Sequence, residues 1–386
     1  MPRVLLNLLY LDPGRTGGME VVARALLPEL AAALPRGWEL MLLMNQRGAE
    51  SEGPWRDLEV RTVPVDVASR AAWVRAELFT APREAKAVRA DLLHSLGNTG
   101  PWTSSVPRSV TVNDLIHHRV PHPGLAVKSR ITGAFVAGGA KRAARVVVAA
   151  TQTRDDLIDV AGVDPGRIDV IPYGISAPTY EPTPEAELRE RLRLGDRPLI
   201  LSPSARQPHK NLRRLIEAHA LLEGPRPLLV LPGYSTAHDD SLRQRTRELG
   251  VQDDVRWLGW IEQGDLEGLY ASSELLVFPS LYEGFGLPVL EAMARGLPVA
   301  CSDRGSLAEI AGDAALIFDP EQPAAIAEAV RTLHGDAALR ERLVVAGRAQ
   351  AARFTWSACA EGYAQSFART LGMQRSAVGP PAAGVS

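Results

Sequence analysis

Residues 275–296 read LLVFPSLYEGFGLPVLEAMARG, and this stretch decides the fold. The apolar run 275–278 predicts a short strand buried on both faces of a sheet. Gly284 and Gly286 allow a tight turn, and Pro288 suits the first position of a following helix. A strand–loop–helix unit of this kind presents backbone N–H groups and a partial positive charge to an anion, most often a phosphate.

Two carboxylates make this stretch more than a phosphate-binding loop. Glu283 lies on the predicted loop, and Glu291 lies just over one turn into the predicted helix. Glu291 is suited to accept hydrogen bonds from neutral hydroxyls, such as those of a ribose. Taken alone, either glutamate also fits an ordinary solvated acid.

The length and composition of the chain limit the choices. A chain of 386 residues with 46% apolar residues has room for two ordinary domains and is not a disordered protein. A formal charge of −2 gives no overall attraction to nucleic acid or membrane. Cys301 and Cys359 supply neither a disulfide framework nor a metal cluster, which fits a reducing cytosol.

Both halves of the chain alternate strand-like and helix-like patterns. The strand-like runs are residues 4–9, 40–44, 58–63, 92–94, 110–112, 146–148, 199–201, 228–231, 255–258, 275–278, 299–301 and 315–318. This alternation predicts an α/β protein whose parallel sheets are covered by helices on both faces. Ligands of such sheets bind at the carboxyl ends of the strands.

Polar residues follow several of these runs. Gly17 and Gly18 follow the first run and precede an amphipathic helix, although the spacing G-x-G-x-x-G is missing. In the N-terminal half, His94 ends the run 92–94 and begins a polar cluster at 94–98, and the pair Asn113-Asp114 follows the run 110–112. We expect these residues to line a ligand site at the edge of the sheet.

A second loop with charge follows residues 199–201. Arg206 and Lys210 lie there, just before a predicted helix that begins near Asn211. Two cations at this position would stabilise a diphosphate, above all a departing one whose negative charge grows as its bond breaks. Taken alone, an arginine and a lysine in a loop are usually surface charges.

Several other charged patterns have simpler explanations. Asp239-Asp240 and Asp253-Asp254 are interpreted as solvated loop or helix-start acids, and no metal site is predicted. Ser306 and Glu309 have the spacing of a helix capping box. The segment 108–145 contains seven lysines and arginines but only one acid, Asp114. This excess predicts either binding of an anionic acceptor or membrane surface, or a solvated helix face. The basic residues are Arg108, Arg119, Lys128, Arg130, Lys141, Arg142 and Arg145.

The string EGFGLPVLEAMA at 283–294 closely resembles the Glu-x7-Glu signature of retaining, nucleotide-sugar-dependent glycosyltransferases of family 4. Arg206, Lys210 and Asn211 resemble the diphosphate-binding segment of the same family. The resemblance extends from Gly17-Gly18 to Trp356. Asn113 is a departure, because many relatives have a histidine before the aspartate, and asparagine cannot become cationic.

The resemblance implies two facing Rossmann-like domains, the GT-B architecture, with the active site in the cleft between them. We expect an acceptor-side domain at 1–175 completed by a C-terminal helix at 355–372, a nucleotide-sugar domain at 176–354, and a disordered tail at 373–386. Residues 167–175 resemble the exit from the first domain. Trp257, Gly259 and Trp260 lie where relatives pass the nucleotide base, although Trp257 also fits a core position.

The resemblance also assigns roles to residues. Catalytic roles fall on Glu283, Arg206 and Lys210. Donor-binding roles fall on Gly17, Gly18, Asn211, Gly284, Phe285, Gly286, Leu287 and Glu291. Candidates on the side of the transferred sugar and the acceptor are His94, Asn113 and Asp114. Neither a metal nor a cofactor is expected, since in the family the acceptor attacks from the face that the diphosphate leaves and a phosphate oxygen takes its proton.

The implied function is transfer of a hexose or deoxyhexose, with mannose from GDP-mannose as the first choice, to a glycan, glycolipid or small-molecule hydroxyl. UDP-glucose and a dTDP-deoxysugar are the other donors considered. A catalytically inactive binding subunit and a nucleotide-sugar epimerase are the alternative functions. We expect no nucleic-acid partner and a cytoplasmic protein, or one peripheral at the inner membrane face, that takes part in polysaccharide or glycolipid assembly.

Overall fold

The computed structural model describes residues 1–120, 126–178 and 180–373. The chain forms two compact units. The N-terminal unit comprises Met1–Gly174 together with the segment that begins at Thr355, and the second unit is Ile175–Phe354. The tail predicted at 373–386 lies outside the described residues from 374 onward.

The N-terminal unit contains a seven-stranded parallel sheet with the order β3-β2-β1-β4-β5-β6-β7. Its strands are β1 (Arg3–Asn7), β2 (Glu39–Asn45), β3 (Glu59–Val63), β4 (Leu92–Ser95), β5 (Arg108–Thr111), β6 (Arg145–Val148) and β7 (Ile168–Val170). Most strand residues are buried, as expected for a sheet covered on both faces.

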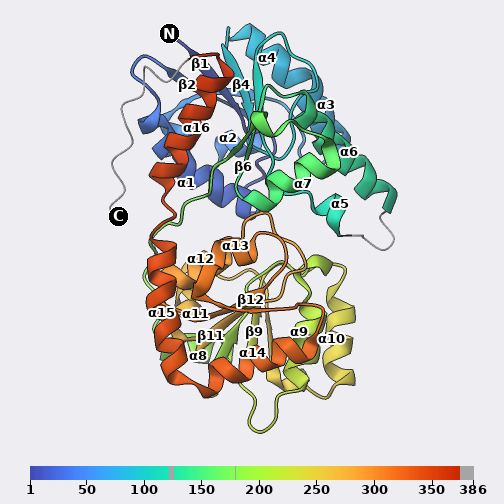
Figure 1. Cartoon of the computed structure of the whole chain (residues 1–386), viewed down its shortest axis with the longest axis vertical. Coiled ribbons are helices and arrows are strands. Elements are labelled where there is room, and N and C mark those ends of the chain that lie inside the picture. Colours follow the sequence, from blue (N-terminus) through green and yellow to red (C-terminus); the bar gives the residue numbers. More distant parts are fainter. Residues whose placement is uncertain (121–125, 179, 374–386) are drawn as a thin grey trace. The chain divides into compact units, whose positions relative to one another are not determined.

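Helices cover both faces of this sheet (Figure 1). They are α1 (Gly18–Ala33), α2 (Gln46–Glu50), α3 (Arg70–Arg75), the π-helix η2 (Ala76–Thr80), α4 (Ala81–Ala87), α5 (Ile116–Arg119), α6 (Ala126–Arg142), α7 (Thr151–Ala161) and α16 (Trp356–Thr370), with 3-10 turns η1 (Pro54–Asp57) and η3 (Pro165–Arg167). The segment from α3 to α4 packs with α6 and α7 on one face. Helix α16 covers the other face beside α1, so the C-terminal end of the chain completes the N-terminal unit.

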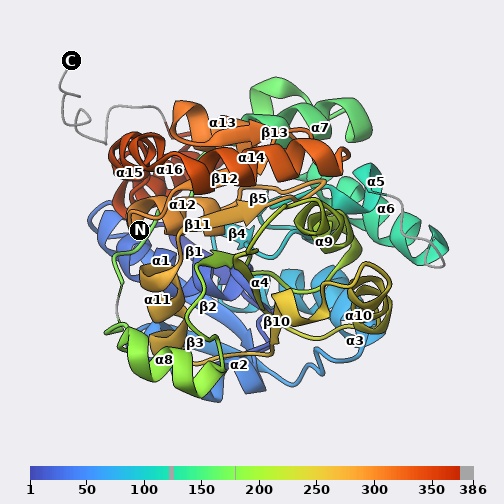
Figure 2. The same ribbon diagram turned by 90° about the horizontal axis from the view of Figure 1, so that it is seen from below.

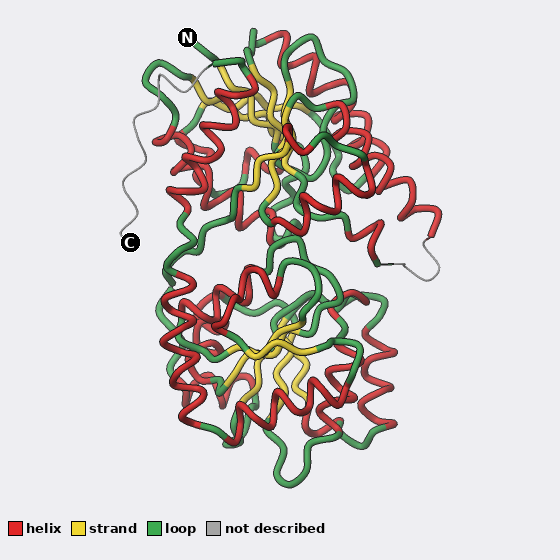
Figure 3. Tube along the Cα trace, in the orientation of Figure 1, coloured by secondary structure: helices red, strands yellow, loops and turns green. Residues whose placement is uncertain are grey.

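The second unit contains a six-stranded parallel sheet with the order β10-β9-β8-β11-β12-β13. Its strands are β8 (Leu199–Leu201), β9 (Leu228–Pro232), β10 (Val255–Leu258), β11 (Leu275–Phe278), β12 (Val299–Ser302) and β13 (Leu316–Phe318). In each unit the strands form a central layer between helices (Figure 3).

The helices of the second unit are α8 (Glu185–Leu192), α9 (Leu212–Ala220), α10 (Asp239–Glu248), α11 (Gln263–Ser272), α12 (Leu287–Ala294), α13 (Leu307–Ala311), α14 (Pro323–Gly335) and α15 (Ala337–Ala351), with 3-10 turns η4 (Pro208–Lys210), η5 (Gln252–Asp254) and η6 (Gly312–Ala314). Helices α9, α10 and α14 pack on one face of the sheet. Helices α11 and α12 contact the other face, and α8 packs against α11 (Figure 2).

The strand order places a topological switch point in each sheet. The chain builds outward in both directions from the β1–β4 pair and from the β8–β11 pair. Loops that leave two such neighbouring strands diverge, and the crevice between them is where ligands of open α/β sheets bind. The loops after β8 and β11 carry Lys210 and Glu283.

The predicted α/β class with parallel sheets is confirmed, and each predicted strand run overlaps an observed strand. Strand β7 was missed, because residues 167–175 were interpreted only as the exit from the first domain. It has three residues with Asp169 at its centre, so it lacks the continuous apolar run that marks the others. Among the described residues, no helix is long and apolar enough to cross a membrane.

The chain passes between the units twice, and the two passages run side by side. The backbone N–H of Ile175 donates to the carbonyl of Phe354 at 3.0 Å. A Cβ atom on Gly174 would lie 2.2 Å from the backbone nitrogen of Trp356. The joint therefore requires glycine at 174, because backbone atoms of the neighbouring segment occupy the space of any side chain.

We expect Gly174→Ala to destabilise the N-terminal unit by about 1–3 kcal/mol, the usual cost of forcing extra volume into a packed site. Urea unfolding monitored by tryptophan fluorescence would measure the loss. Gly335→Ala is the control, since a Cβ at that position meets no atom within 4 Å. Equal stability of the two variants would contradict the close packing at 174.

Candidate active site

Lys210 and Glu283 come together at the switch point of the second sheet. The Lys210 Nζ donates to Glu283 Oε1 at 2.6 Å, and the two side chains are only 17% and 14% exposed. Lys210 follows β8 and Glu283 follows β11, which are paired neighbours in the sheet. The pairing of these two strands therefore brings both residues to one location.

Short backbone links hold these two loops against each other. The N–H of Leu281 donates to the carbonyl of His209 at 2.7 Å. Asn211 has a left-handed backbone with φ of 58°, and its amide donates to the carbonyls of Pro279 and Pro320 at 3.1 and 2.7 Å. Asn211 was predicted to bind the donor, but its amide group instead ties together the loops after β8, β11 and β13.

The electrostatic surroundings keep Glu283 ionised. Burial alone would raise the pKa of Glu283, because it disfavours the charged form. The positive charges of Lys210 and His209 outweigh burial, so the pKa of Glu283 is lowered from its ordinary value. The carboxylate is therefore a permanent hydrogen-bond acceptor at neutral pH, with Lys210 as its counter-ion.

The helix that follows Glu283 starts as predicted, directly after a glycine turn. Gly286 adopts φ of 103°, a left-handed conformation that favours glycine, and Leu287 is the first residue of α12. Phe285 is buried, whereas Gly284 and Leu287 are partly exposed. The eight-residue helix directs its positive dipole end toward the loop that carries Glu283.

Glu291 lies on α12 and contacts α11. The hydroxyl of Tyr270 donates to Glu291 Oε2 at 2.9 Å. Burial raises the pKa of Glu291, although the nearby Arg295 charge and the Tyr270 hydrogen bond oppose this shift. Arg295 is itself bound by Glu267 through two contacts of 2.5 and 2.6 Å. One oxygen of the Glu291 carboxyl group, Oε2, thus accepts the hydrogen bond from Tyr270.

Arg206, predicted to bind the diphosphate, has buried partners in the second unit. Its guanidinium binds the carboxylate of Asp239 and the carbonyl of Leu258, and its side chain is only 3% exposed. Asp239, predicted to be a solvated acid, is buried at the start of α10. Arg206 therefore joins the loops after β8 and β9 to the end of β10, and its guanidinium is paired with Asp239 as Lys210 is paired with Glu283.

Aromatic side chains surround this arginine at the ends of β9 and β10. Trp257 packs against the core of the second unit, as one interpretation of the sequence favoured, and its ring lies 5.2 Å from the Arg206 guanidinium. Trp260 is 63% exposed and stacks on Tyr234 with ring centroids 4.8 Å apart. The exposed Trp260 ring is thus the accessible aromatic face at this edge.

In the N-terminal unit, the glycine turn and the Asn113 loop come together. Gly17 has φ of 63°, and Gly17 and Gly18 are exposed with open space around them. The next residue, Met19, accepts a hydrogen bond at its sulfur from Asn113 Nδ2 at 3.2 Å. Asn98, in the left-handed region, accepts the Asn113 N–H at 2.9 Å, so it holds this loop in place.

Asn113 and Asp114 retain the hydrogen-bonding groups that a site requires. The Tyr173 hydroxyl donates to Asn113 Oδ1, and this contact fixes the orientation of the amide. Asp114 Oδ1 accepts the N–H of Ile116 at 3.1 Å. Asn98 and Tyr173 were not selected from the sequence; Asn98 belonged to the polar cluster after residues 92–94, but only its left-handed backbone distinguishes it.

His94 is a core residue, which corrects its prediction as a sugar- or acceptor-side group. Its side chain is fully buried, and its ring nitrogens contact Ser109 Oγ at 2.8 Å and Thr111 Oγ1 at 3.0 Å. It packs on Tyr363 of α16, and burial lowers the pKa of His94 to about 3. Strand alternation points His94 beneath α16.

Glu77 is a buried acid that sequence patterns did not reveal. It lies on η2, is 1% exposed, and accepts a hydrogen bond from Asn7 Nδ2 at 2.9 Å. The same Asn7 amide contacts Ser95 Oγ at 3.1 Å, at the ends of β1 and β4. Burial raises the pKa of Glu77 to about 8. A charged residue within a helical pattern gave no sign of this position.

Comparisons with known proteins follow the same division of the chain. The model "Glycosyltransferase Family 4" matches residues 16–179, and "Glycosyl transferases group 1" matches residues 184–350. A D-inositol 3-phosphate glycosyltransferase of Acidothermus cellulolyticus is 30% identical over 84% of this chain and 76% of its own length. The chain belongs to glycosyltransferase family 4. The predicted family is thus confirmed.

Other family 4 similarities are more local or concern the fold alone. O-antigen chain mannosyltransferase B of Escherichia coli is 41% identical over 40% of this chain and 41% of its own length. The chain thus spans about two fifths of that relative. Anabaena Alr3699/HepE, crystallised with UDP-glucose, has a TM-score of 0.73 and 18% identity over 96% of this chain and all of that one. The predicted GT-B fold is therefore confirmed.

Most of the basic residues at 108–145 have internal partners in this family 4 protein. Arg119 binds Asp156 and Asp159, and Arg145 binds Asp169. Arg108 donates to the carbonyls of Pro101 and Trp102, and Arg142 to that of Gly138. Arg130 and Lys141 remain exposed, while the side chain of Lys128 is outside the described part. Carboxylates thus neutralise Arg119 and Arg145, whereas hydrogen bonds to carbonyls do not cancel the charges of Arg108 and Arg142.

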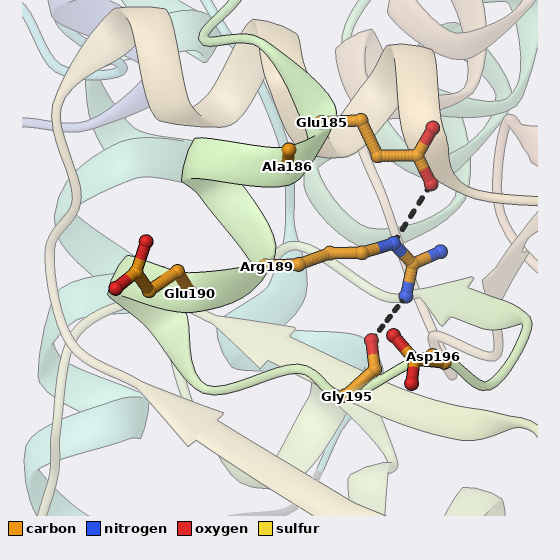
Figure 4. Close-up of a pocket in the computed structure, with 6 residues that line it drawn as sticks. All are labelled: Glu185, Ala186, Arg189, Glu190, Gly195 and Asp196. Carbon is orange, nitrogen blue, oxygen red and sulfur yellow. Dashed lines mark hydrogen bonds and ion pairs between the residues drawn. The ribbon is translucent and has the colours of Figure 1, made fainter.

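A surface hollow in the second unit is separate from all predicted site residues. Its volume is about 670 Å³, and it is lined by Glu185, Ala186, Arg189, Glu190, Gly195 and Asp196 (Figure 4). Arg189 spans the hollow, contacting Glu185 Oε1 at 2.7 Å and the Gly195 carbonyl at 2.6 Å.

Within the described ranges, no cluster of three or more histidine, cysteine or acidic residues is arranged to hold a metal.

The pKa of Glu77 makes the stability of the N-terminal unit depend on pH. Between its ordinary value of 4.5 and about 8, the folded state holds a proton that the unfolded chain has lost, so stability falls as pH rises. We expect Glu77→Gln to reduce this slope by up to about 1.4 kcal/mol per pH unit. Unfolding of both proteins at about pH 5 and pH 8 would measure the difference.

Glu84→Gln is a matched control on the adjoining helix, since Glu84 is ion-paired with Arg61 and Arg83 and its pKa is lowered. This variant should lose stability at neutral pH instead. An unchanged pH slope in Glu77→Gln would contradict a protonated Glu77.

Proposed function

We propose that this protein is a retaining glycosyltransferase that moves a hexose from a nucleotide diphosphate sugar to a hydroxyl acceptor without a metal ion. The observation that carries the proposal is the Lys210–Glu283 ion pair at the β8–β11 switch point, beside the start of α12. A partly buried cation and a partly buried carboxylate at this position match the two demands of a nucleotide sugar, which are charge on the diphosphate and hydroxyl groups on the sugar.

Each part of the donor has a proposed partner in the second unit. The diphosphate binds Lys210 and the positive end of α12, where a helix dipole attracts anions. Glu283 accepts hydrogen bonds from hydroxyls of the sugar. Glu291 accepts hydrogen bonds from hydroxyls of the ribose through Oε1, because Oε2 already accepts the Tyr270 hydroxyl. The exposed Trp260 ring offers a stacking surface for the base.

The chemical step needs stabilisation of the departing diphosphate. As the bond from the sugar to the phosphate breaks, negative charge grows on the leaving oxygen, and Lys210 and the α12 dipole stabilise it. Donor binding exchanges the Lys210–Glu283 contact for contacts of both groups with the donor. A phosphate oxygen takes the proton of the attacking hydroxyl on the same face.

The acceptor hydroxyl is supplied from the N-terminal unit. Asn113 and Asp114 are the groups proposed to meet it, and the hydrogen bond to Met19 brings the Asn113 loop to the turn of Gly17 and Gly18, which is proposed to bind the donor. Asn113 donates and accepts hydrogen bonds but carries no charge, so it orients a hydroxyl and supplies no proton. A glycan or a lipid-linked sugar is the proposed acceptor.

Mannose is the first choice for the transferred sugar, and GDP-mannose for the donor. The similarity to O-antigen chain mannosyltransferase B supports mannose. UDP-glucose is the second choice, because Alr3699/HepE was crystallised with it. Mannosyltransferase similarity is at the level of sequence, whereas the HepE likeness concerns the fold, so the first carries more weight.

Replacing Glu283 tests the proposal. Glu283→Gln should lower transfer from the preferred donor by roughly 100-fold or more, the scale seen when a group that acts in the transition state is removed. The nucleoside diphosphate product, measured by a coupled assay, gives the rate. Glu328→Gln, an exposed surface change on α14, should leave transfer unchanged. Normal transfer by Glu283→Gln would sink the assignment.

The nucleotide and metal requirements give a further test. GDP should raise the melting temperature more than UDP or dTDP, because a ligand that binds the native state stabilises it. Lys210→Ala should weaken this shift strongly, since the diphosphate loses its buried cation. Transfer in EDTA should equal transfer with added Mg²⁺. Loss of transfer in EDTA, restored by Mg²⁺, would contradict the metal-independent chemistry.

A further inference from the structure

A buried serine holds the backbone of the Glu283 loop through hydrogen bonds to two of its carbonyls. Ser306 precedes α13 and is fully buried. Its Oγ lies 2.8 Å from the carbonyl of Phe285 and 3.1 Å from that of Glu283, and its N–H donates to the Glu283 carbonyl at 3.2 Å. The capping box predicted at 306–309 is therefore wrong, because the Ser306 hydroxyl makes no capping bond to α13.

The residues next to Ser306 also contact this loop closely. Gly305 has φ of 64°, and a Cβ there would lie 2.8 Å from both the nitrogen and the oxygen of Glu283. On the other side of the turn, a Cβ on Gly286 would lie 2.6 Å from Leu307 Cδ2. The two loops thus meet with backbone against backbone, and the loop of Glu283 has little room to move.

The loop that carries Ser306 is anchored in its turn. The N–H of Arg304 donates to Ser302 Oγ at 3.0 Å, and its guanidinium contacts Asp319 at 3.0 Å, just after β13. Support therefore passes from β12 and β13 to Ser306, and from Ser306 to the loop after β11. A rigid support of this kind sets where a side chain on the supported loop can reach.

We propose that Ser306 is a positioning residue for sugar transfer, which fixes the location of the Glu283 carboxylate through the carbonyls of Glu283 and Phe285. The inference rests on the proposed function, because it needs Glu283 to act on the sugar. Without a donor, Lys210 binds the Glu283 carboxylate. When a donor binds, Lys210 contacts the diphosphate instead. The hydrogen bonds of Ser306 to the loop backbone are kept in both states. They therefore keep Glu283 aligned when Lys210 binds the diphosphate.

The test compares turnover with binding of a ligand that lacks the sugar. Ser306→Ala should lower kcat for transfer about tenfold, the effect of one lost buried hydrogen bond on alignment. The affinity for GDP and UDP alone should stay within about twofold, since neither contains the group that Glu283 holds. Thr246→Val is the control: it removes another buried hydroxyl, which donates to the Arg243 carbonyl at 2.8 Å on α10, and should leave kcat unchanged.

A second variant keeps the test decisive if Ser306→Ala folds poorly. Gly305→Ala retains the serine hydroxyl but presses a methyl group on the Glu283 backbone, and it should show the same loss of kcat with unchanged GDP and UDP affinity. Equal losses of kcat and nucleotide affinity, in either variant, would overturn the inference, because they would indicate general damage to the unit.

The Glu283→Gln background separates this inference from the proposed function. There, adding Ser306→Ala should cause little further loss, since residues that act through one another are not additive. A full extra loss of about tenfold would refute positioning through Glu283. Normal transfer by Glu283→Gln alone would refute the proposed function. A low rate for Glu283→Gln with wild-type kcat for Ser306→Ala would refute only the role of Ser306.

Discussion

The Lys210–Glu283 ion pair is the contact on which the site of the second unit depends. The two residues are 73 positions apart in the chain, and only the pairing of β8 with β11 brings them together. Taking two charges out of water is costly unless they neutralise each other, so neither residue is stable in this crevice without the other or a ligand. The proposed donor, which supplies both a diphosphate and hydroxyl groups, would replace both partners at once.

Much of the fold and part of the site could be predicted because the decisive signals are local. Short apolar runs mark buried parallel strands, and ligands meet such sheets at the strand ends. These two rules placed Lys210, Glu283 and the glycine turn before α12 where the structure has them. The strand β7 was not predicted, because Asp169 interrupts its apolar pattern. Asp169 is paired with Arg145 and Arg369 from other parts of the chain.

The remaining assignments depended on tertiary partners that spacing does not reveal. Arg206 looked like Lys210, yet Asp239 neutralises it. His94 lies near the end of β4 and Asn113 follows β5, yet the first points under α16 and the second toward the glycine turn. Ser306 fitted a helix cap, yet its hydroxyl serves the Glu283 loop. Each of these side chains has the expected chemistry, and its neighbour across the fold decides how that chemistry is used.

Helix α16 gives the chain a fixed order of assembly. The hydroxyls of Thr111 and Tyr363 bond at 2.9 Å although 252 residues separate them, and Phe367 packs on His94 beneath the helix. During synthesis the first sheet therefore emerges with one face only partly covered, by α1, while Ile175–Phe354 is made as one continuous piece. The second unit can fold while the first still lacks its last helix, so the half that was made first is the half that is completed last.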